Sequence, residues 1–249
     1  MARSKKLRID LLDWVYPPIC ELCGCGLSNG RALCGSCAAD LPKIISPFCE
    51  VCGESFQGQI DGAFDCPNCQ EVSFHFEFAL AALDRSDDAL QLIHRLKYGG
   101  EIHLGRELGR LAVGALKDRR FSTAIAERWP LVPVPLHRSR QRQRMFNQAE
   151  EISLSIGEEI GLPVRKLLRR VRRTVTQTQL SRKQRMDNLK GAFAIQKSWF
   201  VKSPATSLEV PGVILVDDVF TTGSTVDACA KVLRKAGVER VAVLTVLRG

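Results

Sequence analysis

The sequence predicts an α/β protein in which a parallel sheet flanked by helices follows a small N-terminal cysteine-rich domain. Four Cys-x-x-Cys pairs lie within residues 20–69. From about residue 76, short apolar runs alternate with amphipathic stretches, as in strands connected by helices. One late apolar run is followed directly by two carboxylates and a hydroxyl-rich turn. We therefore expect two domains, over residues 16–72 and 76–249.

The cysteine pairs predict zinc binding, because two Cys-x-x-Cys turns complete a tetrahedral site of four thiolates. Ten residues separate the first two pairs and thirteen the last two, which is typical of a double zinc ribbon. Pairing the first with the second and the third with the fourth is the simplest arrangement, and a cross-braced one stays open. Cys25 is expected to lie outside the ligand set. The expected ligands are Cys20, Cys23, Cys34, Cys37, Cys49, Cys52, Cys66 and Cys69.

Disulfides are the alternative use of these cysteines, and they require an oxidising compartment. The basic start of the chain resembles the first part of an export signal, but the apolar stretch after it is short and broken by Asp10 and Asp13. No run of about 18 apolar residues would span a membrane. A reducing, cytoplasmic location without membrane insertion is therefore expected.

The larger domain is expected to begin with a strand over 78–83, a helix over 87–97 that ends at Gly99, and a second helix over 102–116. Residues 131–135 predict a strand entering a constrained loop, since proline cannot continue a ladder. The bonds before Pro133 and Pro135 would permit a cis peptide. A long amphipathic helix is expected from there to about residue 160.

Beyond that helix, residues 172–185 are polar and charged and predict a mobile loop. Strands are expected over 192–195, 213–216 and 241–246, with a helix over 226–236 joining the last two into a parallel pair. Cys229 lies on the apolar stripe of that helix, which places it in the core.

The segment 213–225 carries the clearest chemistry. The carboxylates of Asp217 and Asp218 can accept hydrogen bonds from a ribose diol or hold a divalent cation. An ATPase Walker B strand also ends in acids, but the chain contains no Gly-x-x-x-x-Gly-Lys-Ser/Thr loop. The alternative without a ligand is an ordinary strand-to-helix turn with a Ser or Thr N-cap, but such a cap needs only one hydroxyl and no acidic pair. The phosphate-binding candidates are Thr221, Thr222, Gly223, Ser224 and Thr225.

This string closely resembles the signature of type I phosphoribosyltransferases, which bind 5-phosphoribosyl pyrophosphate (PRPP) with Mg²⁺. By that resemblance, Asp217 and Asp218 hold the ribose hydroxyls and the turn from Thr221 to Thr225 binds the 5-phosphate.

Positive charge is concentrated in residues 138–190, which hold fourteen Lys or Arg against five Asp or Glu. This surplus of nine equals the net charge of the whole chain, +9. Nucleic acid would therefore bind the second domain, although a solvated basic face is the alternative. Phe146 and Phe193 are the aromatic candidates for stacking on bases. The DNA-binding candidates are Arg138, Arg140, Arg142, Arg144 and Arg172.

Nearly the whole chain is similar to the ComF family. The supporting strings are Tyr16-Pro-Pro-Ile-Cys20, Leu96-Lys-Tyr-Gly99, Val132-Pro-Val-Pro-Leu-His137, Arg144-Met-Phe-Asn-Gln148, Thr174-x-x-Gln177-x-x-Leu180, then Arg185, Asn188 and Gly191-Ala-Phe193. Met145 departs from the family, which usually has glycine there. The resemblance implies a zinc ribbon, a phosphoribosyltransferase-like domain, and a role in natural competence or the use of external DNA.

The resemblance also implies roles for two loops. Pro133, Val134, Pro135, Leu136, His137 and Arg138 resemble the pyrophosphate loop. Arg173, Thr174, Gln177 and Arg185, with Arg172, would form a flexible lid that excludes water from the ribosyl centre. Lys97 and Tyr98 would border the acceptor.

These observations leave three functional hypotheses. The first is a competence protein that binds PRPP with Mg²⁺ and single-stranded DNA and handles incoming DNA during natural transformation. The second is a phosphoribosyltransferase of the nucleotide-salvage type with an unidentified acceptor. The third is an adaptor whose zinc ribbon docks on a DNA-processing protein such as a competence helicase.

Overall fold

The computed structural model describes residues 18–27, 30–56, 66–70, 72–173, 188–196 and 210–249. The chain divides into two compact units, Met1–Pro42 and Lys43–Gly249. The first unit contains the first two cysteine pairs and the short helix α2 (Gly35–Asp40), which the Cys34 thiol caps by accepting from the Cys37 amide. The last two pairs belong to the second unit. Within the described ranges, no helix combines the length and the apolar character needed to cross a bilayer.

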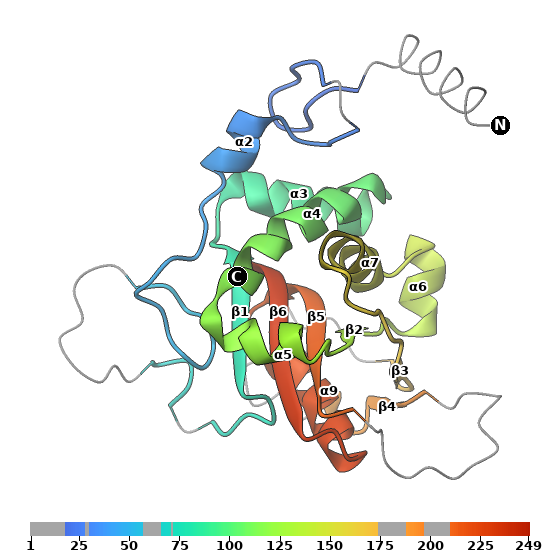
Figure 1. Ribbon diagram of the computed structural model, residues 1–249. Helices are drawn as coiled ribbons and strands as arrows, with labels where there is room; N and C mark the ends of the chain where they lie inside the picture. The colour runs from blue at the N-terminus through green and yellow to red at the C-terminus, as the bar shows by residue number, and fades with distance from the viewer. Residues whose placement is uncertain (1–17, 28–29, 57–65, 71, 174–187, 197–209) are drawn as a thin grey trace. The chain divides into compact units, whose positions relative to one another are not determined.

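A parallel sheet forms the centre of the second unit (Figure 1). Its strands, in spatial order, are β1 (Phe78–Leu83), β6 (Arg240–Arg248), β5 (Gly212–Phe220) and β2 (Leu131–Pro133), and all neighbours run parallel. Nearly every residue of these strands is buried, as expected when helices cover both faces of a parallel sheet. The predicted α/β fold is confirmed.

Helices on both faces bury the sheet. Helices α4 (His103–Val113) and α7 (Gln148–Ile160) contact each other and the strands on one face, and α9 (Ser224–Lys235) contacts β5 and β6 from the other. The remaining described helices are α3 (Asp87–Tyr98), α5 (Ser122–Ala126), α6 (Arg138–Arg144) and the 3₁₀ turns η1 (Gly114–Lys117) and η2 (Arg119–Phe121).

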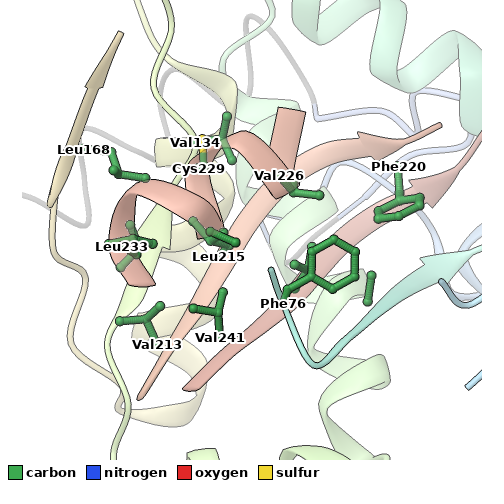
Figure 2. Packing of buried hydrophobic residues seen from close by; sticks show 14 of the residues in the cluster. Phe76, Val134, Leu168, Val213, Leu215, Phe220, Val226, Cys229, Leu233 and Val241 are labelled. Atoms are coloured by element: carbon green, nitrogen blue, oxygen red, sulfur yellow. The ribbon is translucent and has the colours of Figure 1, made fainter. Parts of the chain in front are cut away.

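The α9 side of the sheet holds a continuous apolar cluster (Figure 2). Cys229 and Leu233 from α9 pack against Val213 and Leu215 of β5, and all four are fully buried. This confirms that Cys229 is a core residue. Truncating one of the aliphatic side chains, as in Leu233→Ala, would cost about 2–5 kcal/mol.

One predicted element is wrong: the long helix ending near residue 160 is two helices. Helix α6 ends at Met145, whose φ of 68° is left-handed, and Asn147 starts α7 by accepting from the Ala149 amide. Phe146, between them, is buried. The chain therefore leaves the helical path to place an aromatic ring in the core.

Two strands differ from prediction. β5 extends to Phe220 because β6 continues to pair with it as far as Arg248. The predicted strand near residue 195 is β4 (Phe193–Ile195), and its antiparallel partner β3 (Leu168–Arg170) was not predicted. Among the described peptide bonds, only Ser46–Pro47 is cis, so those before Pro133 and Pro135 are trans. The expected mobile loop lies mostly outside the described residues, including Thr174, Gln177 and Arg185.

Candidate functional site

The two carboxylates lie inside β5 rather than after its end. Neighbouring residues of a strand face opposite sides of the sheet, so Asp217 shares its side with Leu215 and α9, while Asp218 faces α3. On that side, Lys97 Nζ lies 2.9 Å from Asp218 Oδ1 in a largely buried ion pair. The Asp218 amide donates to Asp217 Oδ1 at 2.9 Å.

Asp217 has an unusual electrostatic environment. Burial, and then the negative charge of Asp218, raise the pKa of Asp217 to about 7, against the opposing effects of Lys97 and Arg170. Near neutral pH this carboxyl group is therefore only partly ionised. A cation bound here would favour its ionised form.

The predicted phosphate turn follows directly. Gly223 has a left-handed φ of 74° and forms the N-cap of α9. An added Cβ at Gly223 would lie 2.7 Å from Phe220 Cζ, so only glycine fits here. The hydroxyls of Thr222 and Ser224 lie 2.8 Å apart. Since a helix N-terminus presents unsatisfied amides and positive potential, this turn suits a phosphate group.

A cleft of about 350 Å³ joins the predicted parts of the site. Two of its buried oxygens, Asp218 Oδ2 and Gln148 Oε1, have no hydrogen-bond partner among the described residues. Such oxygens fit ribose hydroxyls or a hard cation such as Mg²⁺. The cleft is lined by Lys97, Tyr98, Val134, Pro135, Leu136, Arg140, Arg144, Gln148, Arg170, Asp217, Asp218, Val219, Thr221 and Thr225.

Gln148 and Arg170 line this cleft but were not among the predicted site residues. Gln148 could have been suspected, because it belongs to the Phe-Asn-Gln string that resembles the ComF family. Arg170 lies on the unpredicted strand β3, where its guanidinium is 5.2 Å from the centre of the Phe193 ring. No local signal distinguishes it from the other arginines of its segment.

The predicted pyrophosphate loop is divided between two clefts. Val134, Pro135 and Leu136 line the cleft just described. Pro133, His137 and Arg138 line a neighbouring cleft of about 600 Å³, which also contacts Pro135 and Leu136. His137 is the N-cap of α6, and its Nδ1 lies 2.8 Å from Ser139 Oγ. Its observed contacts are therefore those of a loop-stabilising residue.

Asn147 holds this loop in place. Its side-chain amide donates to the Val134 carbonyl at 3.0 Å, while its oxygen caps α7. The side chain is buried, so both bonds are shielded from water. The loop and the start of α7, which carries Gln148, are thereby fixed to each other.

Helix α6 separates the predicted DNA-binding arginines into two pairs. Residues four apart share a helix face. Arg140 and Arg144 are partly buried and line the Asp218 cleft, whereas Arg138 and Arg142 are exposed and line a shallow groove with Met145. The arginines that the sequence grouped together therefore face different ligands.

The other sequence candidates lie apart from the cleft or in the core. Arg172 is exposed and donates to the Asn188 carbonyl at 2.6 Å, and Arg173 is exposed beside it. Phe146 and Phe193 are buried, so the suggestion that they stack on bases is wrong. Tyr98 is instead the exposed aromatic at the cleft: it is 75% exposed, with the Arg144 guanidinium 5.1 Å from its ring centre.

The cysteines form two tetrads, as the simplest pairing predicted. One combines Cys20, Cys23, Cys34 and Cys37, and the other Cys49, Cys52, Cys66 and Cys69; the ligand atoms within each lie within 4.8 Å of one another. Cys25 belongs to neither.

Sulfur–sulfur distances of 3.6–3.8 Å within the tetrads are far too long for a disulfide, which requires about 2 Å. They match the spacing of about 3.8 Å that follows from tetrahedral Zn–S bonds of about 2.3 Å. A hydrogen bond with Ser36, followed by one from the Cys37 amide, lowers the pKa of Cys34 to about 5. The residues therefore fit two structural Zn²⁺ ions.

Comparisons with known proteins agree with this geometry. Residues 11–72 match the double zinc ribbon domain model, and residues 151–249 match the phosphoribosyl transferase domain model. The chain is 32% identical over 214 residues to "Competence protein F" of Haemophilus influenzae, covering 86% of this chain and 89% of that protein. It is 29% identical to "DNA utilization protein YhgH" of Salmonella typhimurium (93% and 97% covered) and 24% identical to "Competence protein ComFC" of Bacillus subtilis (90% and 91%).

Proposed function

Because the chain belongs to the competence protein F (ComF) family, we propose that it binds PRPP with Mg²⁺ and single-stranded DNA during the cytoplasmic handling of incoming DNA in natural transformation. One observation carries the PRPP part. A single cleft joins the acidic pair, part of the phosphate turn and two arginines, which together match the diol, the 5-phosphate and the pyrophosphate of one molecule.

Each part of the cleft has a distinct role in this proposal. The phosphate turn holds the 5-phosphate through backbone amides and hydroxyls. Asp218 and Gln148 accept from the ribose hydroxyls or hold Mg²⁺, which would supply charge neutralisation to the pyrophosphate. Lys97 forms an ion pair with Asp218 in the free protein. Arg140 and Arg144 face the side where a leaving pyrophosphate develops charge.

Calorimetric titration with PRPP and Mg²⁺ tests this assignment. Asp218→Asn removes one carboxylate and should lower affinity at least ten-fold, since it loses charge-assisted hydrogen bonds or a metal ligand. Asp118→Asn is the matched control, because Asp118 is a partly buried carboxylate that also forms an ion pair, with Arg120, but lies outside the cleft. Unchanged affinity in Asp218→Asn would remove this cleft from consideration.

The DNA part rests on the exposed arginine pair of α6. Arg138 and Arg142 face solvent, away from the acidic residues of the cleft, so they are available to strand phosphates. Replacing both with alanine should reduce the magnitude of the slope of log affinity against log salt by about 1.4, at about 0.7 per phosphate. Fluorescence anisotropy with a labelled oligothymidylate between 50 and 200 mM salt would measure this slope.

The partly buried pair provides the matched control. Arg140→Ala with Arg144→Ala removes the same charge and should weaken PRPP binding while leaving the DNA slope unchanged. If this second pair flattened the slope instead, the strand would have to cross the small-molecule cleft. An unchanged slope in both double variants would place the DNA footprint elsewhere.

A salvage-type phosphoribosyltransferase is the second candidate, and Tyr98 favours it. Its exposed ring at the mouth of the cleft, beside Arg144, offers a surface on which a base could stack. In that reaction the acceptor forms a bond to the ribosyl carbon as the bond to pyrophosphate breaks. Pyrophosphate release from PRPP and Mg²⁺ should then depend on an added free base, whereas the competence role predicts PRPP binding without such dependence.

A further inference from the structure

Arg248 lies buried beside the phosphate turn, at the end of β6. Only 4% of its surface is exposed. Its Nη1 donates to the carbonyls of Phe220 and Thr221, at 2.9 Å each, and to that of Gly249 at 2.7 Å. Its guanidinium carbon lies 5.1 Å from the centre of the Phe220 ring. One side chain therefore holds the backbone on which the turn begins.

The same guanidinium also contacts a residue next to the second cysteine tetrad. Arg248 Nη2 forms an ion pair with Glu54 Oε2, and Glu54 follows Cys52 by two residues. The Asn68 side chain, between Cys66 and Cys69, donates to the same Glu54 oxygen at 3.1 Å. The Glu54 carbonyl accepts from the Cys49 amide at 2.8 Å. Glu54 is thus held by both Cys-x-x-Cys turns of this tetrad.

Apolar side chains also connect the phosphate turn to the second cysteine tetrad. The Phe220 ring contacts Phe76 edge to face, with 6.2 Å between centroids. Both rings belong to the buried cluster that contains Cys52 and Cys66. Because the Phe220 ring lies directly against Gly223, a shift of that ring would alter the turn directly. The turn and the tetrad therefore share a polar link and an apolar one.

The second cysteine ribbon, which carries the tetrad of Cys49, Cys52, Cys66 and Cys69, is also hydrogen-bonded to the sheet. The Ala79 amide of edge strand β1 donates to the Val51 carbonyl at 2.8 Å. Gly53, at a left-handed φ of 68°, approaches so closely that an added Cβ would lie 2.9 Å from the Ala79 carbonyl oxygen. A fixed ribbon gives Glu54 a fixed position, from which it can orient Arg248.

We infer that Glu54 and Arg248 are positioning residues through which the second cysteine ribbon sets the geometry of the 5-phosphate turn. This rests on the proposed function, since it assigns that turn to phosphate. Glu54 supplies the anion that Arg248 needs while buried, and Arg248 then holds the Phe220 and Thr221 carbonyls. The state of the ribbon would thereby tune phosphate affinity without any ribbon residue touching the ligand.

The test compares two ligands on the zinc-loaded full chain. Glu54→Gln keeps the shape of the side chain and removes its charge. Its affinity for ribose 5-phosphate should fall about five- to thirty-fold, the usual range of such couplings. Its affinity for Mg²⁺-pyrophosphate, which is bound away from the turn, should stay within two-fold of wild type. A general loss of stability would weaken both ligands.

Glu50→Gln is the matched control, because Glu50 lies in the same ribbon but pairs with Arg120 rather than Arg248. It should leave both affinities unchanged. If Glu50→Gln weakened ribose 5-phosphate as much as Glu54→Gln, or if Glu54→Gln weakened neither ligand, the inference would be overturned. Should Glu54→Gln fail to fold, Arg248→Lys retains the cation but not its forked hydrogen bonds, and it should show the same selective loss.

Hydrogen exchange of the ligand-free protein separates this inference from the proposed function. Amides of residues 220–225 should exchange faster in Glu54→Gln than in wild type or Glu50→Gln, with no change in α7. Equal exchange would overturn the positioning role whatever the ligand data show. If wild type bound neither ligand while the turn amides responded as expected, the phosphate assignment would fall and the structural link would stand.

Discussion

Asp217 and Asp218 are adjacent in the chain but occupy different environments because they face opposite sides of β5. Asp218 is paired with Lys97, whereas Asp217 faces the apolar α9 side, where burial raises its pKa to about 7. A buried carboxyl group with a strongly raised pKa is typical of functional sites. The acidic pair thus combines one carboxylate that is already paired with a lysine and one whose ionisation a bound cation would favour.

This difference predicts a pH-dependent gain of stability in Asp217→Asn. A carboxyl group with a raised folded-state pKa binds more protons when folded, so its ionisation destabilises the fold progressively from about pH 4 to pH 7. Asparagine resembles the protonated acid and escapes this cost. We expect a gain of about 4 kcal/mol at pH 8 and almost none at pH 4, measured by urea unfolding. PRPP binding should be lost in the same variant.

Asp118 provides a control of opposite sign. Burial acts to raise its pKa, but hydrogen bonds from Arg120 and the charge of that arginine outweigh burial and lower it. Its ionised form therefore stabilises the fold above its unfolded pKa, and that contribution is lost as pH falls. Asp118→Asn should destabilise the protein at pH 8 and have little effect in acid. A gain at pH 8 in both variants would contradict the role of ionisation.

Met145 is a second residue whose conformation has a measurable cost. It ends α6 at a φ of 68° with 85% of its surface exposed, so it is strained and contributes little packing. Met145→Gly should stabilise the protein by about 1 kcal/mol, because glycine adopts the left-handed cap freely. Met145→Ala keeps the strain and should show no gain in the urea midpoint. Equal effects of the two variants would point to side-chain packing instead.

At the scale of elements, periodicity predicted the strands and helices that face the core. It failed where long-range packing decides the conformation: Met145 itself does not favour a helix end, Asn147 alone signals the start of a new helix, and β3 is short and partly charged. The same limit applies to the site. The string from Asp217 to Thr225 identified the turn, but Gln148 and Arg170 line the cleft, and Arg248 holds the turn, from distant segments. Their roles depend on which strands become neighbours, and local sequence does not encode that directly.

The turn between β5 and α9 offers a prediction about steric fit. Gly223→Ala would place a Cβ against the Phe220 ring in addition to the left-handed strain, so it should cost about 3 kcal/mol. Gly161 has a nearly identical φ of 72° but no atom within 4 Å of an added Cβ. Gly161→Ala should cost only about 1 kcal/mol. Equal losses in thermal unfolding would mean that the Phe220 ring moves aside freely.

At the scale of the whole molecule, the two cysteine tetrads differ in how they are built into the chain. The N-terminal tetrad belongs to the small unit, and Cys23 is exposed. In the second tetrad, Cys49, Cys52 and Cys66 are buried in the cluster that also packs against α9. The second ribbon is thus part of the core of the larger unit, although the sequence presents four similar pairs. Its metal should be linked to the stability of that core.

Zinc removal should therefore occur in two steps. A chelator should take zinc rapidly from the N-terminal tetrad, which is the more exposed of the two, and slowly from the more buried second tetrad, giving two phases in a colorimetric release assay. Cys34→Ser should abolish the fast phase and leave the main unfolding transition unchanged. Cys52→Ser should abolish the slow phase and lower the midpoint of that transition, because buried ligands lose both their metal and their packing. A single phase, or equal destabilisation by both variants, would show that the tetrads contribute alike.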